Sequence, residues 1–213
     1  MKLYGYFRSS AAYRCRIALN LKGLAPEYVA VHLRRGDQRA SDYQNVNPQG
    51  LVPSLEIGGH VITQSLAIIE WLDETYPEPA LLPIDALARA DVRAFALAIA
   101  CDIHPLNNLR VLNYLKAELH LEQTAIDVWY RHWVEQGLAS CERLLRRGGW
   151  RGPYCFGESP TLADVCLAPQ LYNARRFDSD LSACPTLLAI EKVSKAHPAF
   201  AAAAPDRQPD MEP

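Results

Sequence analysis

The sequence predicts a chain of two parts, a small α/β unit followed by an all-helical segment, and three observations support this fold class. Short strand-like runs of aromatic and β-branched residues occur only in the first third of the chain. The expected elements there follow the order strand, helix, strand, and then two strands and a helix. A proline-rich stretch at residues 77–83 then separates this unit from a remainder that shows helical periodicity without strand alternation.

The first expected unit of structure is a strand, a helix and a parallel strand. Residues 2–6 form a short run with aromatic content, and residues 11–22 carry apolar side chains at helical spacing until Gly23 ends the helix. Residues 28–33 alternate and are partly β-branched, as is typical of a strand. The helical crossover makes the second strand parallel to the first.

The second expected unit is a hairpin followed by a helix. Residues 54–57 and 61–63 predict two strands joined around the Gly58-Gly59 pair, after a short helix at residues 41–45. Ser65 has the chemistry of an N-cap for a helix that runs to residue 76. The whole α/β unit is therefore expected to span residues 1–82.

The remainder predicts an all-helical domain over residues 87–213. Apolar periodicity indicates four helices and a short fifth one, and a capping-box pattern with Asp164 as its acidic member begins at Thr161. The expected ranges are 86–113, 122–145, 162–176, 185–196 and 198–203.

Composition excludes several classes of function. The 213 residues carry a formal net charge of −2, which gives no overall basic field for nucleic acid or for an anionic membrane. The apolar stretches are too short to span a membrane, and no secretory pattern is found at the N-terminus, so we expect a cytoplasmic protein. The six cysteines show no metal-ligand spacing and are expected to be reduced core residues; no metal site is predicted.

Three polar sites fall at strand ends or helix starts of the α/β unit, where such sheets place ligands. Arg8-Ser9-Ser10 combines a guanidinium, two hydroxyls and a helix N-terminus, which favour a thiolate or a carboxylate. Gln49-Gly-Leu-Val52-Pro53 offers exposed Val52 backbone to a peptide-like ligand if the Pro53 bond is cis. Gln64-Ser65 offers a carboxylate site at a helix start. Ordinary serine caps and a trans proline are the alternative interpretations.

Two further candidate sites lie in the helical domain. A polar interruption with a Pro105 kink places several side chains at three- and four-residue spacing, where they face one cleft or solvent: His104, Asn107, Asn108 and Arg110. Arg175-Arg176 at a helix C-terminus is either dipole complementation or, if one side chain points inward, a carboxylate clamp.

Five segments together make the chain similar to the zeta class of glutathione transferases, most closely to bacterial members that act as maleylacetoacetate isomerases. Residues 6–19 (Tyr-Phe-Arg-Ser-Ser-Ala-Ala-Tyr-Arg-Cys-Arg-Ile-Ala-Leu) and 102–110 (Asp-Ile-His-Pro-Leu-Asn-Asn-Leu-Arg) resemble that class in particular. Residues 47–53, 64–70 and 160–164 resemble glutathione transferases more broadly. Where the zeta pattern has a cysteine after the serine pair, this chain has Ala11, which removes any protein-thiol role there.

The resemblance implies a thioredoxin-like N-terminal domain with cis-Pro53, a helical C-terminal domain that completes the pocket, and glutathione as cofactor. It implies a homodimer and assigns glutathione contacts to Ser9, Ser10, Gln49, Val52, Pro53, Gln64, Ser65, His104 and Asn108. Arg8 and Arg176 match the positions that hold substrate carboxylates, with Arg175 and Arg110 as weaker candidates.

The reaction implied by the resemblance is cis-trans isomerisation of maleylacetoacetate, a small dicarboxylate, to fumarylacetoacetate. The glutathione thiolate adds to the double bond, the resulting single bond rotates, and the thiolate leaves. Three alternatives stay open: maleylpyruvate isomerase, glutathione conjugation or dehalogenation of small α-halo acids, and a non-catalytic glutathione-binding protein. The sequence does not decide which of Ser9 and Ser10 faces the thiol.

Overall fold

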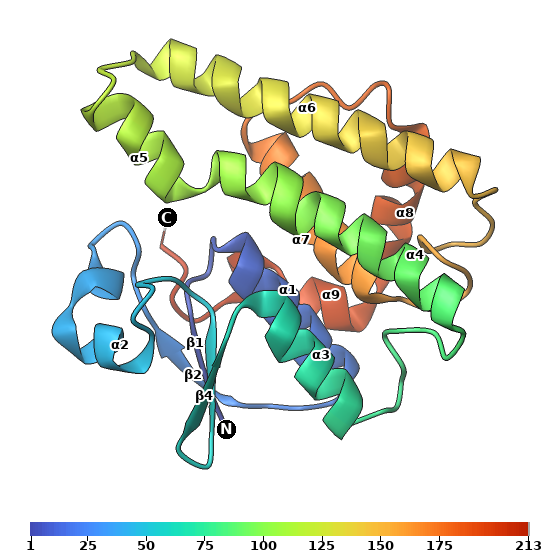
Figure 1. Cartoon of the computed structure of the whole chain (residues 1–213), viewed down its shortest axis with the longest axis horizontal. Coiled ribbons are helices and arrows are strands. Elements are labelled where there is room, and N and C mark those ends of the chain that lie inside the picture. Colours follow the sequence, from blue (N-terminus) through green and yellow to red (C-terminus); the bar gives the residue numbers. More distant parts are fainter. Residues whose placement is uncertain (213) are drawn as a thin grey trace. The chain divides into compact units, whose positions relative to one another are not determined.

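The computed structural model describes residues 1–212, which form two compact units (Figure 1). Unit 1 comprises Met1–Ala80 together with the residues from Ala196 onward, and unit 2 comprises Leu81–Lys195. The expected boundaries at 1–82 and 87–213 assign the C-terminal residues to the helical domain, whereas residues 196–212 belong to the unit that contains the sheet. The assignment of glutathione binding to the first domain and of the substrate pocket to the second stays a prediction.

Unit 1 is built on a four-stranded mixed sheet with the order β2-β1-β3-β4. Its strands are β1 (Lys2–Gly5), β2 (Glu27–Ala30), β3 (Ser54–Ile57) and β4 (His60–Thr63). Strand β2 is parallel to β1, while β3 is antiparallel both to β1 and to β4. Leu3 on the central strand pairs with Tyr28 on one side and with Leu55 on the other. This sheet confirms the predicted thioredoxin-like α/β class.

The helices of unit 1 cover both faces of the sheet. Figure 1 shows α1 (Ser10–Leu21) and α3 (Ser65–Thr75) on one side and α2 (Ser41–Val46) on the other. Helix α9 (Pro198–Ala203) packs against α1, where the Asn20 amide donates to the Ala199 carbonyl at 2.9 Å and Arg16 Nε donates to the Ala203 carbonyl at 3.0 Å. The C-terminal helix therefore forms part of the scaffold around the start of α1.

Unit 2 is helical throughout its regular elements, as predicted. It contains α4 (Ala86–Leu97), α5 (Leu109–Ala117), α6 (Gln123–Arg147), α7 (Leu162–Arg176) and α8 (Pro185–Ala196). The expected single helix over residues 86–113 is wrong, because a π-helical turn at Ala98–Ile103 and a 3-10 turn at His104–Asn107 interrupt it. Pro105 has no N–H to continue the helical ladder, and Asn108 instead caps a new helix.

The capping box at the start of α7 is present as predicted. The Asp164 carboxylate accepts hydrogen bonds from the Thr161 N–H at 2.8 Å and from the Thr161 hydroxyl at 2.9 Å. Its second oxygen accepts from the Cys155 N–H at 2.8 Å. Burial raises the pKa of Asp164, and these hydrogen bonds oppose that rise.

The cysteines are all free thiols, and five of them are buried. The expectation that all six are core residues is wrong for Cys101, which is exposed. In the part of the chain that the structure describes, every helix is too short or too polar to cross a bilayer.

Candidate functional site

The loop between β1 and α1 carries the first predicted site. The Ser9 hydroxyl caps α1 by accepting a hydrogen bond from the Ala12 N–H at 3.2 Å, and the Ser9 N–H donates to the Tyr6 carbonyl at 2.9 Å. Ser9 is partly exposed, whereas Ser10, the first helical residue, is only 5% exposed. The cap and a ligand contact are compatible, because a hydroxyl that accepts one hydrogen bond still has a proton to donate.

Two charged side chains, the buried Arg16 and the partly buried Asp210, fix the backbone of this loop. Arg16 Nη2 donates to the Phe7 carbonyl at 3.0 Å, and Asp210 Oδ2 accepts from the Phe7 N–H at 3.0 Å. The same Asp210 oxygen accepts from the Tyr28 hydroxyl at 3.1 Å. The guanidinium of the next residue, Arg8, lies 4.9 Å from the centre of the Phe7 ring. The position of Arg8 therefore depends on groups at both ends of the chain.

The second predicted site is the loop before β3, and the Val52-Pro53 bond is cis, as predicted. The Leu51 carbonyl accepts hydrogen bonds from the Tyr43 hydroxyl at 2.6 Å and from the Asn47 amide at 2.7 Å. Among residues 1–212, the Val52 backbone N–H and C=O make no hydrogen bond. The loop is thus tied down beside Val52, and the Val52 peptide groups are left for a ligand.

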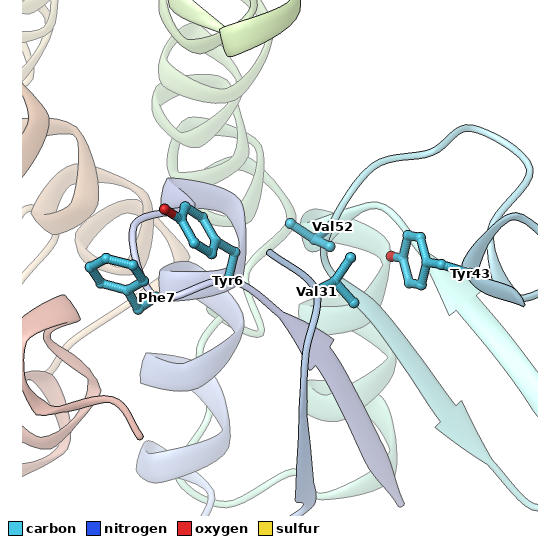
Figure 2. Packing of buried hydrophobic residues seen from close by; sticks show 5 residues of the cluster. All are labelled: Tyr6, Phe7, Val31, Tyr43 and Val52. Atoms are coloured by element: carbon cyan, nitrogen blue, oxygen red, sulfur yellow. The ribbon is translucent and has the colours of Figure 1, made fainter. Parts of the chain in front are cut away.

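Buried side chains pack against Val52 and its loop. Figure 2 shows Val52 and Val31 lying between the rings of Tyr6 and Tyr43, and these residues form one buried cluster with Phe7. Burial raises the pKa of Tyr43, while its hydrogen bonds with Ser54 and Asn47 lower it. Tyr43 therefore stays a neutral donor to the loop at physiological pH.

The third predicted site lies at the start of α3. Gln64 is the N-cap residue, with a φ of +70°, so the expectation that Ser65 is the N-cap is wrong. Ser65 instead begins the helix, is 6% exposed and receives a hydrogen bond of 3.4 Å from Arg14 Nη1. The Gln64 amide donates to the Gln49 side-chain oxygen at 2.9 Å. Two predicted residues from separate loops are thereby brought together.

In unit 2 the side chains of two residues of the predicted polar cluster hydrogen-bond to the backbone of nearby helical turns. The Asn108 side chain accepts from the Arg110 N–H at 3.1 Å, the Asn107 amide donates to the Ile103 carbonyl at 3.4 Å, and Arg110 is exposed. A cavity of about 580 Å³ in this unit is lined by other residues of the interruption and of α6, including Cys101, Asp102, Pro105, Leu106, Trp133 and Arg143. The assignment of His104, Asn108 and Arg110 to one ligand cleft stays a prediction.

The two arginines at the end of α7 have different surroundings. Arg175 forms a two-pronged ion pair with Glu191, with Nε at 2.9 Å from Oε1 and Nη2 at 2.5 Å from Oε2. Arg176 lies over the Phe177 ring at 4.7 Å, and within residues 1–212 no acidic side chain pairs with it. Arg175 is thus committed to an internal partner, whereas the Arg176 charge is available to a ligand.

Comparisons with known proteins identify the family of nearly the whole chain. Residues 3–80 match the glutathione S-transferase N-terminal domain, and residues 127–202 match the glutathione S-transferase C-terminal domain. The chain belongs to the glutathione S-transferase family. Within that family it is 53% identical to the probable maleylacetoacetate isomerase of Vibrio cholerae, over 98% of this chain and 97% of that protein.

Two solved structures of this family are similar over their full length. The first is the holo structure of maleyl pyruvate isomerase, described as a bacterial zeta-class glutathione S-transferase, with 48% identity, a TM-score of 0.97 and complete coverage of both chains. The second is maleylacetoacetate isomerase from Anaeromyxobacter dehalogenans with dicarboxyethyl glutathione and citrate bound in its active site. It shows 45% identity and a TM-score of 0.88, and the match covers 100% of this chain and 97% of that one. The zeta-class resemblance is therefore confirmed.

Several residues of this glutathione S-transferase that shape the site were missed by sequence reasoning. Tyr43 and Asn47 fix the Val52 loop, and Arg16 and Asp210 fix the Arg8 loop. Asn47 is the first of residues 47–53, which resemble glutathione transferases, so the sequence already pointed to a role for it. Asp210 carried none, because its partner is 203 residues away. Among residues 1–212, no group of three or more His, Cys, Asp or Glu side chains is placed to hold a metal ion.

Proposed function

We propose that this glutathione S-transferase is a glutathione-dependent isomerase that converts maleylacetoacetate to fumarylacetoacetate. The observation that carries the proposal is the full-length similarity to relatives named for this activity, together with the polar arrangement of unit 1. That arrangement offers hydroxyls at the start of α1, free peptide groups at Val52 and a polar helix start at Gln64-Ser65. These groups suit a thiol, a peptide backbone and an α-carboxylate, all of which glutathione carries.

The cysteinyl peptide and the γ-glutamyl carboxylate of glutathione each have a partner in the proposal. The Val52 N–H and C=O pair with the cysteinyl peptide of glutathione in the manner of an added strand. Gln64, Ser65 and the N-terminus of α3 receive the γ-glutamyl carboxylate, and Gln49 contributes through its hydrogen bond with Gln64. In unit 2, His104 and Asn108 are assigned as further glutathione contacts.

The thiol is activated at the start of α1. A thiolate is favoured by hydroxyl donors and by the positive end of a helix, which lower the pKa of a sulfur placed there. Between the two serines we assign the thiolate contact to Ser9, because its hydroxyl is partly exposed and keeps a proton to donate while it caps the helix. Ser10 is almost fully buried and is assigned a supporting role.

The chemistry is an addition followed by an elimination. The glutathione sulfur forms a C–S bond with one alkene carbon, and the π-electron pair moves onto the conjugated carbonyl as an enolate. The former double bond is now single and rotates. The enolate pair then re-forms the double bond in the trans geometry as the C–S bond breaks, and glutathione leaves unchanged. Donors that are fixed in place stabilise the enolate.

Arginines recognise the substrate in this proposal. Maleylacetoacetate carries two carboxylates, and a guanidinium binds a carboxylate through two parallel hydrogen bonds. Arg8 and Arg176 are assigned this role, because neither is engaged by an internal carboxylate among residues 1–212. Arg110 stays a weaker candidate, and the Glu191 ion pair makes Arg175 the least favoured of the four.

A second candidate substrate is maleylpyruvate, because the holo maleyl pyruvate isomerase structure has a TM-score of 0.97 against this chain. It requires the same cofactor and the same chemistry on a shorter acid. For either substrate we propose a cytoplasmic homodimer, which the resemblance to the family supports. Sedimentation of the purified protein will measure the oligomeric state.

The test is the rate of loss of each cis acid with and without glutathione, using the purified protein. We expect glutathione-dependent isomerisation with a higher kcat/KM for maleylacetoacetate than for maleylpyruvate. A preference for maleylpyruvate would transfer the assignment to the second candidate. Accumulation of a thioether product would indicate conjugation in place of isomerisation, and no reaction with either acid would leave a binding protein.

A further inference from the structure

Arg14 on α1 is a buried arginine whose charge lacks an internal partner. Its side chain is 2% exposed and is among the largest fully buried side chains of the structure. Its hydrogen bond, from Nη1 to the Ser65 hydroxyl, is long at 3.4 Å. Among the described residues, Nε and Nη2 of Arg14 have no hydrogen-bond acceptor. A guanidinium remains charged at any physiological pH, so this is a buried positive charge with most of its donors unused.

Arg16, two residues further along the same helix, shows what a structural arginine does in this fold. It is 5% exposed, and its three nitrogens donate to the carbonyls of Ala203, Tyr6 and Phe7. Burial of a charge without such partners destabilises a protein, and buried polar groups are nearly always satisfied. The surroundings of Arg14 therefore lack an acceptor, most simply an anion.

The position of that missing anion is given by the start of α3. The only side-chain hydrogen bond of Arg14 within residues 1–212 leads to Ser65, the first residue of this helix. The Gln64 N-cap makes no side-chain capping bond, and the first turn contains no acidic residue. By contrast, α1 is capped by Ser9 and α4 by Asp85. The positive end of α3 and a buried guanidinium thus meet without a negative charge between them.

We propose that Arg14 is a positioning residue for the γ-glutamyl carboxylate of glutathione, and that it acts through Ser65. The guanidinium donates to the Ser65 oxygen, which leaves the Ser65 proton to donate toward the carboxylate. Its buried charge, close to the helix start, adds to the attraction for an anion there. This inference rests on the proposed function, because it takes glutathione as the ligand and Ser65 as its carboxylate contact.

The experiment compares two ligands and three proteins. The ligands are glutathione and its analogue with γ-aminobutyrate in place of the γ-glutamyl residue, which lacks only the α-carboxylate. The proteins are the wild type, Arg14→Met and Ser65→Ala. Calorimetry measures the Kd of each pair, and thermal unfolding without ligand measures the stability of each protein.

We expect Arg14→Met to bind glutathione about 10- to 100-fold more weakly and to bind the analogue as the wild type does. Without ligand, Arg14→Met should unfold at the same temperature as the wild type or higher, because an unpartnered buried charge is removed. Ser65→Ala should show the same selective loss. Arg14→Met combined with Ser65→Ala should lose little more than either single change, because one acts through the other.

An equal loss of affinity for both ligands, or no loss for either, would overturn the inference. So would a lower unfolding temperature combined with unchanged ligand selectivity, since that is the behaviour of a structural arginine. If Arg14→Met fails to fold, Arg14→Lys, which keeps the charge, takes its place. Arg14→Lys should bind glutathione several-fold more weakly and bind the analogue as the wild type does. Equal changes in both affinities would contradict the inference. Failure of the proposed function is distinguishable, because a wild type that binds glutathione without isomerising either acid leaves these binding comparisons intact.

Discussion

The carboxylate of Asp210 accepts a hydrogen bond from the backbone N–H of Phe7 at 3.0 Å, although 203 residues separate them in sequence. The same carboxylate oxygen accepts from the Tyr28 hydroxyl, beside β1. Phe7 immediately precedes Arg8 and Ser9, to which we assign the substrate carboxylate and the thiolate. The C-terminal segment thus sets the backbone position of the loop that carries the proposed chemistry.

Replacement of Asp210 by Ala should disorder this loop and lower kcat/KM about tenfold, because small misplacements of catalytic groups slow catalysis strongly. The lost hydrogen bonds to a charged acceptor should also lower the free energy of unfolding by about 1–3 kcal/mol. Steady-state kinetics and urea unfolding will measure the two effects. Glu212→Ala is the matched control, since Glu212 pairs with His32 and Arg35 and, among the described residues, makes no hydrogen bond to Phe7 or Tyr28. Equal kinetic effects of the two changes would argue against a specific role for Asp210.

Ser9 has two separable functions, as a helix cap and as the proposed donor to the thiolate. Ser9→Ala should lose both, whereas Ser9→Gly should retain most of the cap stability because Gly is tolerated at an N-cap. We therefore expect Ser9→Ala to unfold about 1 kcal/mol more easily and Ser9→Gly to unfold only slightly more easily. Both should raise the pKa of bound glutathione and lower kcat at neutral pH. Ultraviolet titration of the thiolate will measure that pKa; if it moved in Ser10→Ala instead, the assignment of Ser9 would be wrong.

Arg176 and Arg175 form an adjacent pair with opposite expected effects. Arg176→Met should raise the KM for the dicarboxylate about 10-fold or more while the Kd of glutathione stays nearly unchanged, because a charged contact to the substrate alone is lost. Arg175→Met should leave KM unchanged and lower the stability, since Glu191, which is only 5% exposed, loses its bidentate partner. Parallel losses of substrate and glutathione affinity in Arg176→Met would remove that residue from the substrate site.

Glu191 should make the stability of the protein sensitive to acid. Burial raises the pKa of this carboxyl, but the hydrogen bonds and charges of Arg175 and Lys195 lower it by more than burial raises it. The pKa of Glu191 therefore lies below the ordinary value of 4.5. The folded state therefore holds this proton less tightly than the unfolded state. The stabilisation is present above pH 4.5 and is lost as the pH falls through the folded pKa.

Comparison of the wild type with Glu191→Gln isolates this contribution. The free energy of unfolding of the wild type should decrease more steeply than that of Glu191→Gln as the pH falls below 4.5. Asp164, whose pKa is raised by burial, contributes with the opposite sign, but it is common to both proteins and cancels in the comparison. Identical slopes in urea unfolding at several acidic pH values would show that Glu191 is not held ionised by its partners.

The features that sequence reasoning predicted are those with a local signature. Alternating runs gave the four strands, and the Thr161 to Asp164 spacing gave the capping box that the structure contains. The family resemblance gave the cis bond at Pro53. The strands and the capping box depend on residues within a few positions of one another, so their physical cause is visible in a short window.

The features that sequence reasoning missed depend on contacts between distant segments. Nothing around Asp210 indicates a hydrogen bond to Phe7, and nothing in the Arg14-Cys15-Arg16 run shows that one arginine is satisfied and the other is not. The helix expected across residues 98–108 failed for a different reason. The polar interruption and Pro105 were visible in the sequence, but a proline inside a helical stretch can either kink the helix or end it, and here the π-helical and 3-10 turns end it.

The most direct test of the account is turnover with limiting glutathione. The purified protein is mixed with maleylacetoacetate in large excess over glutathione, and fumarylacetoacetate and free thiol are measured as the reaction proceeds. If glutathione adds and then leaves, all of the substrate is isomerised and the free thiol returns to its starting amount. If the reaction instead stops after one equivalent of substrate per glutathione with the thiol consumed, the protein is a conjugating transferase and the isomerase assignment is contradicted.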